Sequence, residues 1–291
     1  MTEIIKKYDF KEGLPQELEI LDFSYFYRNF YNDMIKPHRA EFYHVLWFQK
    51  GGTTHWIDFK LIEIEKDNTL LFVPKNSVQR FDKKKYVKGK AILFTDDFFC
   101  KTQQDTKYLK TNILFNDLQS ISKVEIEESK YTFLQIFNQI KSELSISKDN
   151  IQNTILKNYL YNFLLQAERV KKSLNFNEFD KNQNLEYTMQ FKELLEANFI
   201  THKKVDFYCS QLHITPKKLN ASTSTILGRS PKRIINDRII LEAKRLLVHT
   251  TNNSKEISYS LGFQEPTNFI KFFKKNLNTT PLAFREKHNK E

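Results

Sequence analysis

Residues 253–285 read NSKEISYSLGFQEPTNFIKFFKKNLNTTPLAFR, and this stretch decides the fold of the C-terminal part of the chain. Asn253 is a good N-cap, and Glu256 follows it at the spacing of a capping box, so a helix is expected to begin here. Gly262 is expected to end that helix, because glycine readily adopts the positive φ that a sharp turn requires. A second helix is expected over 265–276.

One face of this second helix is apolar, and the rest of its surface is polar and basic. Four apolar residues recur at helical spacing and predict a buried stripe: Phe269, Phe272, Phe273 and Leu277. Five residues fall outside the stripe: Thr267, Asn268, Lys271, Lys274 and Lys275. A helix, a glycine turn and a helix with a basic face are typical of the helix-turn-helix motif, whose second helix enters the DNA major groove. An ordinary helical hairpin with a solvated surface is the alternative.

Three segments of this region resemble the signature of the AraC/XylS family of transcription regulators. They are EISYSLGF from Glu256, FIKFFKK from Phe269 and TPLAFR from Thr280. The run 233–247 resembles the connecting helix of that family, and the whole resemblance covers roughly residues 184–288. It implies double-stranded operator or promoter DNA as a partner, a homodimer and contact with RNA polymerase. Activation is the usual role that it suggests, but the sequence does not decide between activation and repression.

The positive charge of the chain is concentrated in the same region. The 291 residues have a net charge of +11, and residues 184–291 hold 18 Lys and Arg against 10 Asp and Glu, a net +8. Contacts with DNA phosphates need such a concentration of charge. Cys100 and Cys209 are far apart, and no apolar stretch approaches the roughly 18 residues that span a bilayer. We therefore expect a cytoplasmic protein with no disulfide framework, no cofactor and no membrane partner.

Residues 184–291 are expected to form an all-α domain with two helix-turn-helix motifs. A long helix over 231–249 would join them and set their separation to about one turn of DNA. In the first motif, helices are expected at 205–212 and 215–227. Three polar residues of its second helix are candidate DNA contacts: Lys217, Lys218 and Asn220.

The first motif departs from the pattern of the family that it resembles. Ser222 and Thr223 stand where the family usually has an apolar pair, and Ala221 stands where a long polar residue is usual. Ser and Thr are also poor helix formers, because their hydroxyls compete for backbone hydrogen bonds. We therefore expect this motif to have lost some packing and some reach toward DNA.

Residues 1–118 are expected to form a small antiparallel β-barrel of the jelly-roll kind. Short apolar runs lie at 42–48, 55–64, 69–73 and 91–94, with turn residues between them. Closely spaced short strands favour an antiparallel barrel or jelly roll. Together with the C-terminal helices, this barrel makes the chain an α+β protein.

The spacing of polar residues in the barrel resembles the two cupin motifs. The positions that hold metal ligands in cupins are occupied here by His38, Ala40, His44 and Gln79. Alanine cannot bind a metal, and a neutral amide is a poor ligand for the transition metals that imidazole suits. The resemblance therefore implies the fold, whereas the substitutions argue against a bound metal.

A cupin-like sensor ahead of the DNA-binding domain is common in the AraC family, and it implies a small molecule in the barrel. The candidate lining groups combine aromatic walls with a few polar anchors: His38, His44, Trp47, Trp56 and Gln79. Strand alternation places His44 and Trp47 on opposite faces, so the five residues cannot all line one cavity. A packed barrel without a ligand is the alternative.

Residues 119–180 are expected to be helical. Apolar residues at helical spacing predict helices at 127–144 and 150–174, and the apolar stripe of the second helix is wide and aromatic. That stripe could pack on the barrel, or it could form the dimerisation surface that the resemblance implies. The polar residues 171–184 resemble a linker.

The favoured interpretation is a ligand-responsive, sequence-specific transcription regulator without enzymatic activity. We expect Thr267, Asn268 and Lys271 to read base edges, and Lys274 and Lys275 to contact phosphates. One alternative is a metal-free or degenerate cupin-type enzyme that acts on a small sugar or acid, with the helical domain as a targeting module. Another is a regulator that needs no ligand and keeps a vestigial barrel.

Overall fold

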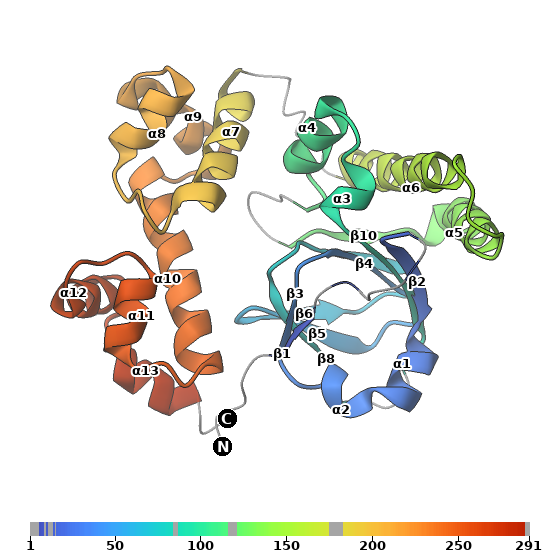
Figure 1. Ribbon diagram of the computed structural model, residues 1–291, viewed down its shortest axis with the longest axis horizontal. Coiled ribbons are helices and arrows are strands. Elements are labelled where there is room, and N and C mark those ends of the chain that lie inside the picture. Colours follow the sequence, from blue (N-terminus) through green and yellow to red (C-terminus); the bar gives the residue numbers. More distant parts are fainter. Residues whose placement is uncertain are drawn as a thin grey trace. The chain divides into compact units, whose positions relative to one another are not determined.

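The computed structural model describes residues 6–8, 10, 14, 16–83, 87–115, 121–174 and 183–288 (Figure 1). The chain divides into two compact units, an N-terminal unit of residues 6–178 and a C-terminal unit that contains residues 179–291. The division falls between residues 178 and 179. The predicted linker 171–184 falls largely on residues outside the described ones.

The strands of the N-terminal unit form two five-stranded sheets. In spatial order, the first sheet contains β1 (Lys6–Tyr8), β3 (His38–Ala40), β8 (Val78–Phe81), β5 (Thr53–Ile57) and β6 (Lys60–Ile64). The second contains β10 (Lys123–Glu125), β7 (Thr69–Val73), β4 (Tyr43–Phe48), β9 (Gly89–Phe94) and β2 (Leu18–Asp22). The expected antiparallel architecture is confirmed, with the exception of the parallel pair β1 and β3.

The central strand β4 separates two hydrophobic cores. Leu46 and Phe48 pack between the sheets, together with residues of the first sheet such as Ile57 and Phe81. Val45 and Trp47 point the other way, into the core beneath the helices. Every residue of β4 is buried because both of its faces are covered. This explains why the strand reads as a continuous apolar run rather than as an alternating one.

Two long helices, α5 (Lys130–Leu144) and α6 (Gln152–Leu174), cover the outer face of the second sheet (Figure 1). The predicted stripe of α5 is buried, and Leu160 and Phe163 of α6 pack in the same core. The wide stripe of α6 thus packs within the N-terminal unit. The described helices of residues 121–174 therefore pack against the second sheet.

Short helices complete the N-terminal unit. They are α1 (Phe23–Asn29), α2 (Tyr31–Met34), α3 (Asp96–Phe99), α4 (Gln103–Thr111) and the 3-10 turn η1 (Glu127–Ser129). The segment that forms α1 and α2 was not singled out in the sequence. No helix in the described parts of the chain is both long enough and apolar enough to cross a membrane.

The described residues of the C-terminal unit are all helical or in turns, as expected. The helices are α7 (Gln183–Asn198), α8 (Val205–Leu212), α9 (Pro216–Leu227), α10 (Pro231–His249), α11 (Ser254–Ser260), α12 (Pro266–Leu277) and α13 (Pro281–His288). The capping box of Asn253 and Glu256 is confirmed at the start of α11. Helix α12 ends one residue later than expected, with Asn278 in the left-handed conformation as its C-cap.

Gly262 is expected to be indispensable for the stability of the C-terminal unit. Its φ is +71°, and a Cβ atom there would lie 2.1 Å from the carbonyl oxygen of Ile200. Gly228 has a similar φ of +63° but open space around it, so it is a matched control. Gly228→Ala should lower the unfolding free energy only by the cost of a left-handed alanine, about 1–2 kcal/mol. Gly262→Ala should lower it by more, because the backbone at Ile200 must also move.

The two variants are compared by urea unfolding followed by far-ultraviolet circular dichroism. Tryptophan fluorescence reports the N-terminal unit alone, because both tryptophans, Trp47 and Trp56, lie there. It should be unchanged in either variant. Equal losses for Gly262→Ala and Gly228→Ala would contradict the importance of the close approach to Ile200.

Candidate functional site

The second helix-turn-helix motif consists of α11, a turn at Gly262 and α12. Phe269 and Phe273 of α12 are fully buried, whereas Phe272 and Leu277 at the edges of the predicted stripe are half-buried. The ring of Phe263, in the turn, packs against Phe269 with a centroid separation of 5.5 Å. These contacts fix which face of α12 is turned outward.

The outward face of α12 carries the predicted contact residues. Five side chains are exposed there: Thr267, Asn268, Lys271, Lys274 and Lys275. Because they belong to one helix whose opposite face is buried, they form one polar surface with three positive charges. Below we call these five residues the α12 surface.

The first motif consists of α8, a turn at His213 and α9. The hydroxyl of Thr215 accepts a hydrogen bond from the Lys218 backbone N–H, which confirms Thr215 as the N-cap. Lys217 and Asn220 are exposed, whereas Lys218 is half-buried. The Lys218 ammonium lies 5.6 Å from the centroid of the Tyr187 ring, so it is turned partly toward α7.

The two hydroxyl residues of α9 occupy core positions. Ser222 and Thr223 are fully buried. The Ser222 hydroxyl lies 2.9 Å from the Lys218 carbonyl and 3.0 Å from the side-chain oxygen of Asn184. These partners reduce the cost of burying the hydroxyl. The positions are therefore internal, as in the family pattern, but they contribute hydrogen bonds instead of apolar contact.

The turn of the second motif contacts the segment between α7 and α8. The Lys203 ammonium, just before α8, donates to the carbonyl of Gly262 at 2.9 Å and to that of Ile200 at 2.5 Å. It also lies 5.0 Å from the ring centroid of Phe263. Burial lowers the pKa of Lys203 from its usual value. The turn of the second motif is thus fastened to the segment between α7 and α8.

Helix α10 is contacted by α7, the first helix of the C-terminal unit, and by α13, its last. Its Arg238 guanidinium lies 2.8 Å from the carboxylate of Glu196 and 3.9 Å from the ring centroid of Phe199, both near the end of α7. At the other end, Arg285 of α13 donates to the carbonyl of Leu247 at 2.7 Å. In the segment TPLAFR, Arg285 therefore helps to hold α13 against α10.

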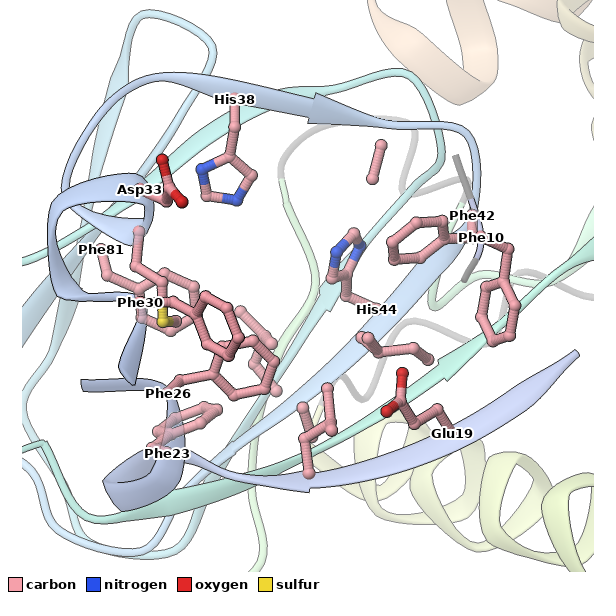
Figure 2. Close-up of a pocket in the computed structure, with 16 residues that line it drawn as sticks. Phe10, Glu19, Phe23, Phe26, Phe30, Asp33, His38, Phe42, His44 and Phe81 are labelled. Carbon is pink, nitrogen blue, oxygen red and sulfur yellow. The ribbon is translucent and has the colours of Figure 1, made fainter. Parts of the chain in front are cut away.

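A cavity of about 270 Å³ lies in the N-terminal unit, bounded by the inner faces of the sheets and by α1 and α2 (Figure 2). Its aromatic walls are the six phenylalanines Phe10, Phe23, Phe26, Phe30, Phe42 and Phe81. Its polar lining residues are Glu19, Asp33, His38 and His44. Among the described lining residues there is no lysine or arginine.

Two of the five predicted lining residues, His38 and His44, do line this cavity. Gln79 stands behind them: its side-chain amide lies 3.0 Å from Nε2 of His44 and 2.9 Å from Nε2 of His55. Gln79 therefore orients His44 without lining the cavity. His55 was overlooked in the sequence, although alternation in 53–57 turns it inward together with Ile57.

The two candidate tryptophans are not among the residues that line this cavity. Trp47 lies on the opposite face of β4, where its indole N–H donates to the side-chain oxygen of Asn68 at 3.2 Å. Trp56 is half-buried, and the guanidinium of Arg80 lies 4.7 Å from its ring centroid. Three of the six phenylalanines in the walls belong to α1 and its C-cap. The i, i+3, i+7 spacing of Phe23, Phe26 and Phe30 was the signal that could have revealed them.

Both histidines held by Gln79 are uncharged at neutral pH. Burial lowers the pKa of His44 well below its usual value, and a backbone contact with Phe42 acts in the opposite direction. Burial lowers the pKa of His55 to about 3, while the hydrogen bond with Gln79 raises it somewhat. Within the described residues, no group of three or more His, Cys, Asp or Glu side chains is placed to hold a metal ion.

Residues 208–287, which run from α8 to α13, match the family described as "Helix-turn-helix domain". The C-terminal unit therefore contains a helix-turn-helix domain. The chain is 26% identical over 146 residues to the "Lactose operon transcription activator" of Staphylococcus xylosus, covering 50% of this chain and 51% of that protein. It is 23% identical over 158 residues to the transcriptional activator RhaS of Escherichia coli, covering 54% and 55%.

The chain spans about half the length of these relatives. Among solved structures, it is similar to ToxT from Vibrio cholerae, with 16% sequence identity, coverage of 93% of this chain and 94% of that chain, and a TM-score of 0.43. The predicted contact residues Thr267 to Lys275 lie within the region that matches the helix-turn-helix family, as do those of α9.

The uncharged state of His55 predicts a pH dependence of stability. The folded-state pKa of His55, about 3, lies below its usual value of 6.5, so the unfolded state binds more protons between these two pH values. The stabilisation is complete above about pH 6.5 and is lost as the pH falls, by about 1.4 kcal/mol per pH unit for one such group. In His55→Gln, the unfolding free energy of the N-terminal unit should depend less on pH. Its slope against pH should fall by the amount that corresponds to about one bound proton.

This slope is measured by urea unfolding at pH 4.5, 5.5 and 6.5, with tryptophan fluorescence as the signal. His202→Gln changes an exposed histidine of the C-terminal unit and should leave the slope unchanged. If His55→Gln and the unaltered protein show the same slope, His55 does not resist protonation in the folded state.

Proposed function

We propose that this chain is a sequence-specific transcription regulator that binds double-stranded DNA through both helix-turn-helix motifs. The observation that carries the proposal is the α12 surface within an AraC-type domain. Its side chains are exposed, while Phe269 and Phe273 anchor the opposite face of the helix. A recognition helix needs this combination of a fixed orientation and a polar, basic outer face. The named relatives are transcription activators, which favours a regulator over a cupin-type enzyme.

The residues of the α12 surface divide by their chemistry. Lys271 suits the O6 and N7 acceptors of guanine, and Asn268 can pair with adenine. Thr267, in the first turn of the helix, completes the set that would read base edges. Lys274 and Lys275 follow in the last turns, where we assign them to phosphates, which any sequence offers.

The first motif contributes less sequence reading in this proposal. Lys217 and Asn220 are its exposed contact candidates, and Lys218 is turned partly toward Tyr187. The neighbouring Ala221 has no group that could reach a base. We therefore assign most base reading to α12 and a supporting role to α9.

The N-terminal cavity supports the second half of the proposal, in which a small molecule controls DNA binding. Such a molecule acts only if it binds one arrangement of the protein more tightly than another. A largely apolar cavity with a few polar groups suits a small-molecule site. A homodimer and contact with RNA polymerase belong to the same proposal and rest on the family resemblance.

Two substitutions on the α12 surface test the division of roles. DNA sites are selected from random sequence, and binding is then measured for Lys271→Ala and Lys275→Ala. Lys271→Ala should cost about 1–3 kcal/mol on the best site and relax one base position. Lys275→Ala should weaken all sequences alike and reduce the slope of log affinity against log salt by about 1.

Lys148→Ala removes the same charge from an exposed loop of the N-terminal unit and is the matched control. It should leave both the preferred sequence and the salt slope unchanged. Equal and sequence-independent losses for Lys271→Ala and Lys275→Ala would refute the assignment of Lys271 to a base. Failure to enrich any sequence with the unaltered protein, in the presence and absence of candidate effectors, would refute the proposed function.

A further inference from the structure

We infer that Lys203 is a positioning residue, whose ammonium sets the place of α12 relative to α9 and thereby the spacing between the two halves of a DNA site. The first part of this inference needs only the fold of the C-terminal unit, and the second part rests on the proposed function. It follows from the partners of the ammonium, from what those partners would lack without it and from the elements that the contact connects.

The Lys203 ammonium bridges two backbone segments instead of pairing with an acid. It donates to the carbonyl of Gly262 at 2.9 Å and to that of Ile200 at 2.5 Å, and it lies 5.0 Å from the ring centroid of Phe263. Burial is the only resolved cause of its lowered pKa, so no carboxylate of the described residues offsets its charge. A half-buried ammonium without a carboxylate depends on these two carbonyls for its polar contacts.

The two carbonyls depend on the ammonium in turn. Neither has another hydrogen-bond donor among the described residues. The segments approach so closely that a Cβ atom on Gly262 would lie 2.1 Å from the oxygen of Ile200 and 2.9 Å from Nζ of Lys203. Water would be a weaker partner for both oxygens, because charge-assisted hydrogen bonds are roughly twice as strong as neutral ones. The ammonium therefore favours the one seating of the turn in which both carbonyls reach it.

On one side, this contact is passed on to α12. Phe263 follows Gly262 directly, and its ring packs against Phe269 and Phe272 of α12 with centroid separations of 5.5 Å each. Phe269 is fully buried, and a side chain in a close-packed core is not free to shift by itself. A shift of the turn at Gly262 would therefore carry the recognition helix with it.

On the other side, the contact is passed on to the first motif. The hydroxyl of Tyr208, in α8, donates to the carbonyl of His202 at 2.7 Å, and α8 in turn packs against α9. The Lys232 ammonium, at the start of α10, donates to the carbonyl of Lys203 itself at 3.1 Å. The backbone that carries Lys203 is thus anchored to α8 and to α10. Its side chain therefore links the first motif to the turn of the second.

Lys204 provides a matched comparison within the same segment. It carries the same charge next to Lys203 in the chain, but its side chain is exposed and makes no hydrogen bond or ion pair with the described residues. A role in attracting DNA through charge alone would be shared by both lysines. A positioning role belongs to Lys203 only.

The first test measures the separation of α9 and α12 without DNA. Spin labels are attached to the full chain at Thr225→Cys on α9 and Lys275→Cys on α12, both exposed positions, after Cys100 and Cys209 are replaced by alanine. Double electron–electron resonance then gives the distribution of distances between the labels. The chain with Lys203 intact and its Lys204→Met variant should both give one narrow distribution. Lys203→Met should broaden or shift it, because methionine keeps an unbranched stem over Phe263 but has no N–H to donate.

A second variant keeps this test decisive if Lys203→Met does not fold, as judged by far-ultraviolet circular dichroism. Lys203→Gln then takes its place, since its neutral, shorter side chain also lacks the ammonium and should likewise broaden the distribution. A distribution in the folded Lys203 variant that matches that of Lys204→Met would overturn the inference.

The second test asks whether the same contact sets the spacing of a DNA site. Affinities are compared for a selected site, for the half of it that α12 reads, and for the site with one base pair inserted between its halves. Relative to Lys204→Met, Lys203→Met should bind the whole site about tenfold more weakly and the half-site equally well. The inserted base pair should cost Lys203→Met less affinity than it costs the unaltered protein, because a less restrained α12 can follow the displaced half. Losses by the same factor on the whole site and the half-site would contradict a role in spacing.

The two tests separate this inference from the proposed function. The label distances need no DNA, so they judge the role of Lys203 even if no DNA sequence is enriched, an outcome that would refute only the regulator. A protein that enriches a two-part DNA site but shows unchanged distances in Lys203→Met refutes only the positioning role.

Discussion

The close approach of two backbone segments, at Gly262 and Ile200, is the constraint on which the C-terminal unit depends. No side chain fits between them, and the Lys203 ammonium binds the carbonyl oxygens of both. The turn of the second motif is therefore seated on the segment that leads into the first. Helix α10 connects the same two motifs covalently and is itself tied to α7 through Arg238. The contact with the segment that leads into α8 and the covalent link through α10 both restrain the second motif relative to the first. The separation of the two recognition helices is then a property of the fold and not of a flexible linker.

The N-terminal unit uses buried polar groups in a different way. Gln79 bridges His44 and His55, and it is 2% exposed, whereas His55 is fully buried. Because the amide has one donor side and one acceptor side, it holds the two Nε2 atoms in opposite protonation states. The imidazoles are thus fixed in position while remaining neutral. The wall of the cavity behind His44 is therefore held by buried hydrogen bonds between neutral groups.

The helices of the second motif could be predicted from the sequence because their signals are local. A capping box at Asn253, a turn glycine at Gly262 and a phenylalanine stripe in α12 each act within a few residues. The contact between Gly262 and Ile200 could not be predicted, since it joins residues 62 positions apart through tertiary packing. Likewise, alternation placed His44 and Trp47 on opposite faces of β4, but it could not say which face met the cavity. The parallel pairing of β1 with β3 and the wall formed by α1 depend on how the chain closes over the sheets.

The central claim is that the two motifs read DNA as one rigid body. It is tested most directly by inserting base pairs between the two halves of a selected DNA site and measuring affinity. With a rigid domain, an insertion of five base pairs should reduce binding to that of the half-site read by α12. An insertion of ten should not restore it, because the motifs cannot separate by a further turn. Undiminished binding after either insertion, or recovery at ten base pairs, would contradict the account.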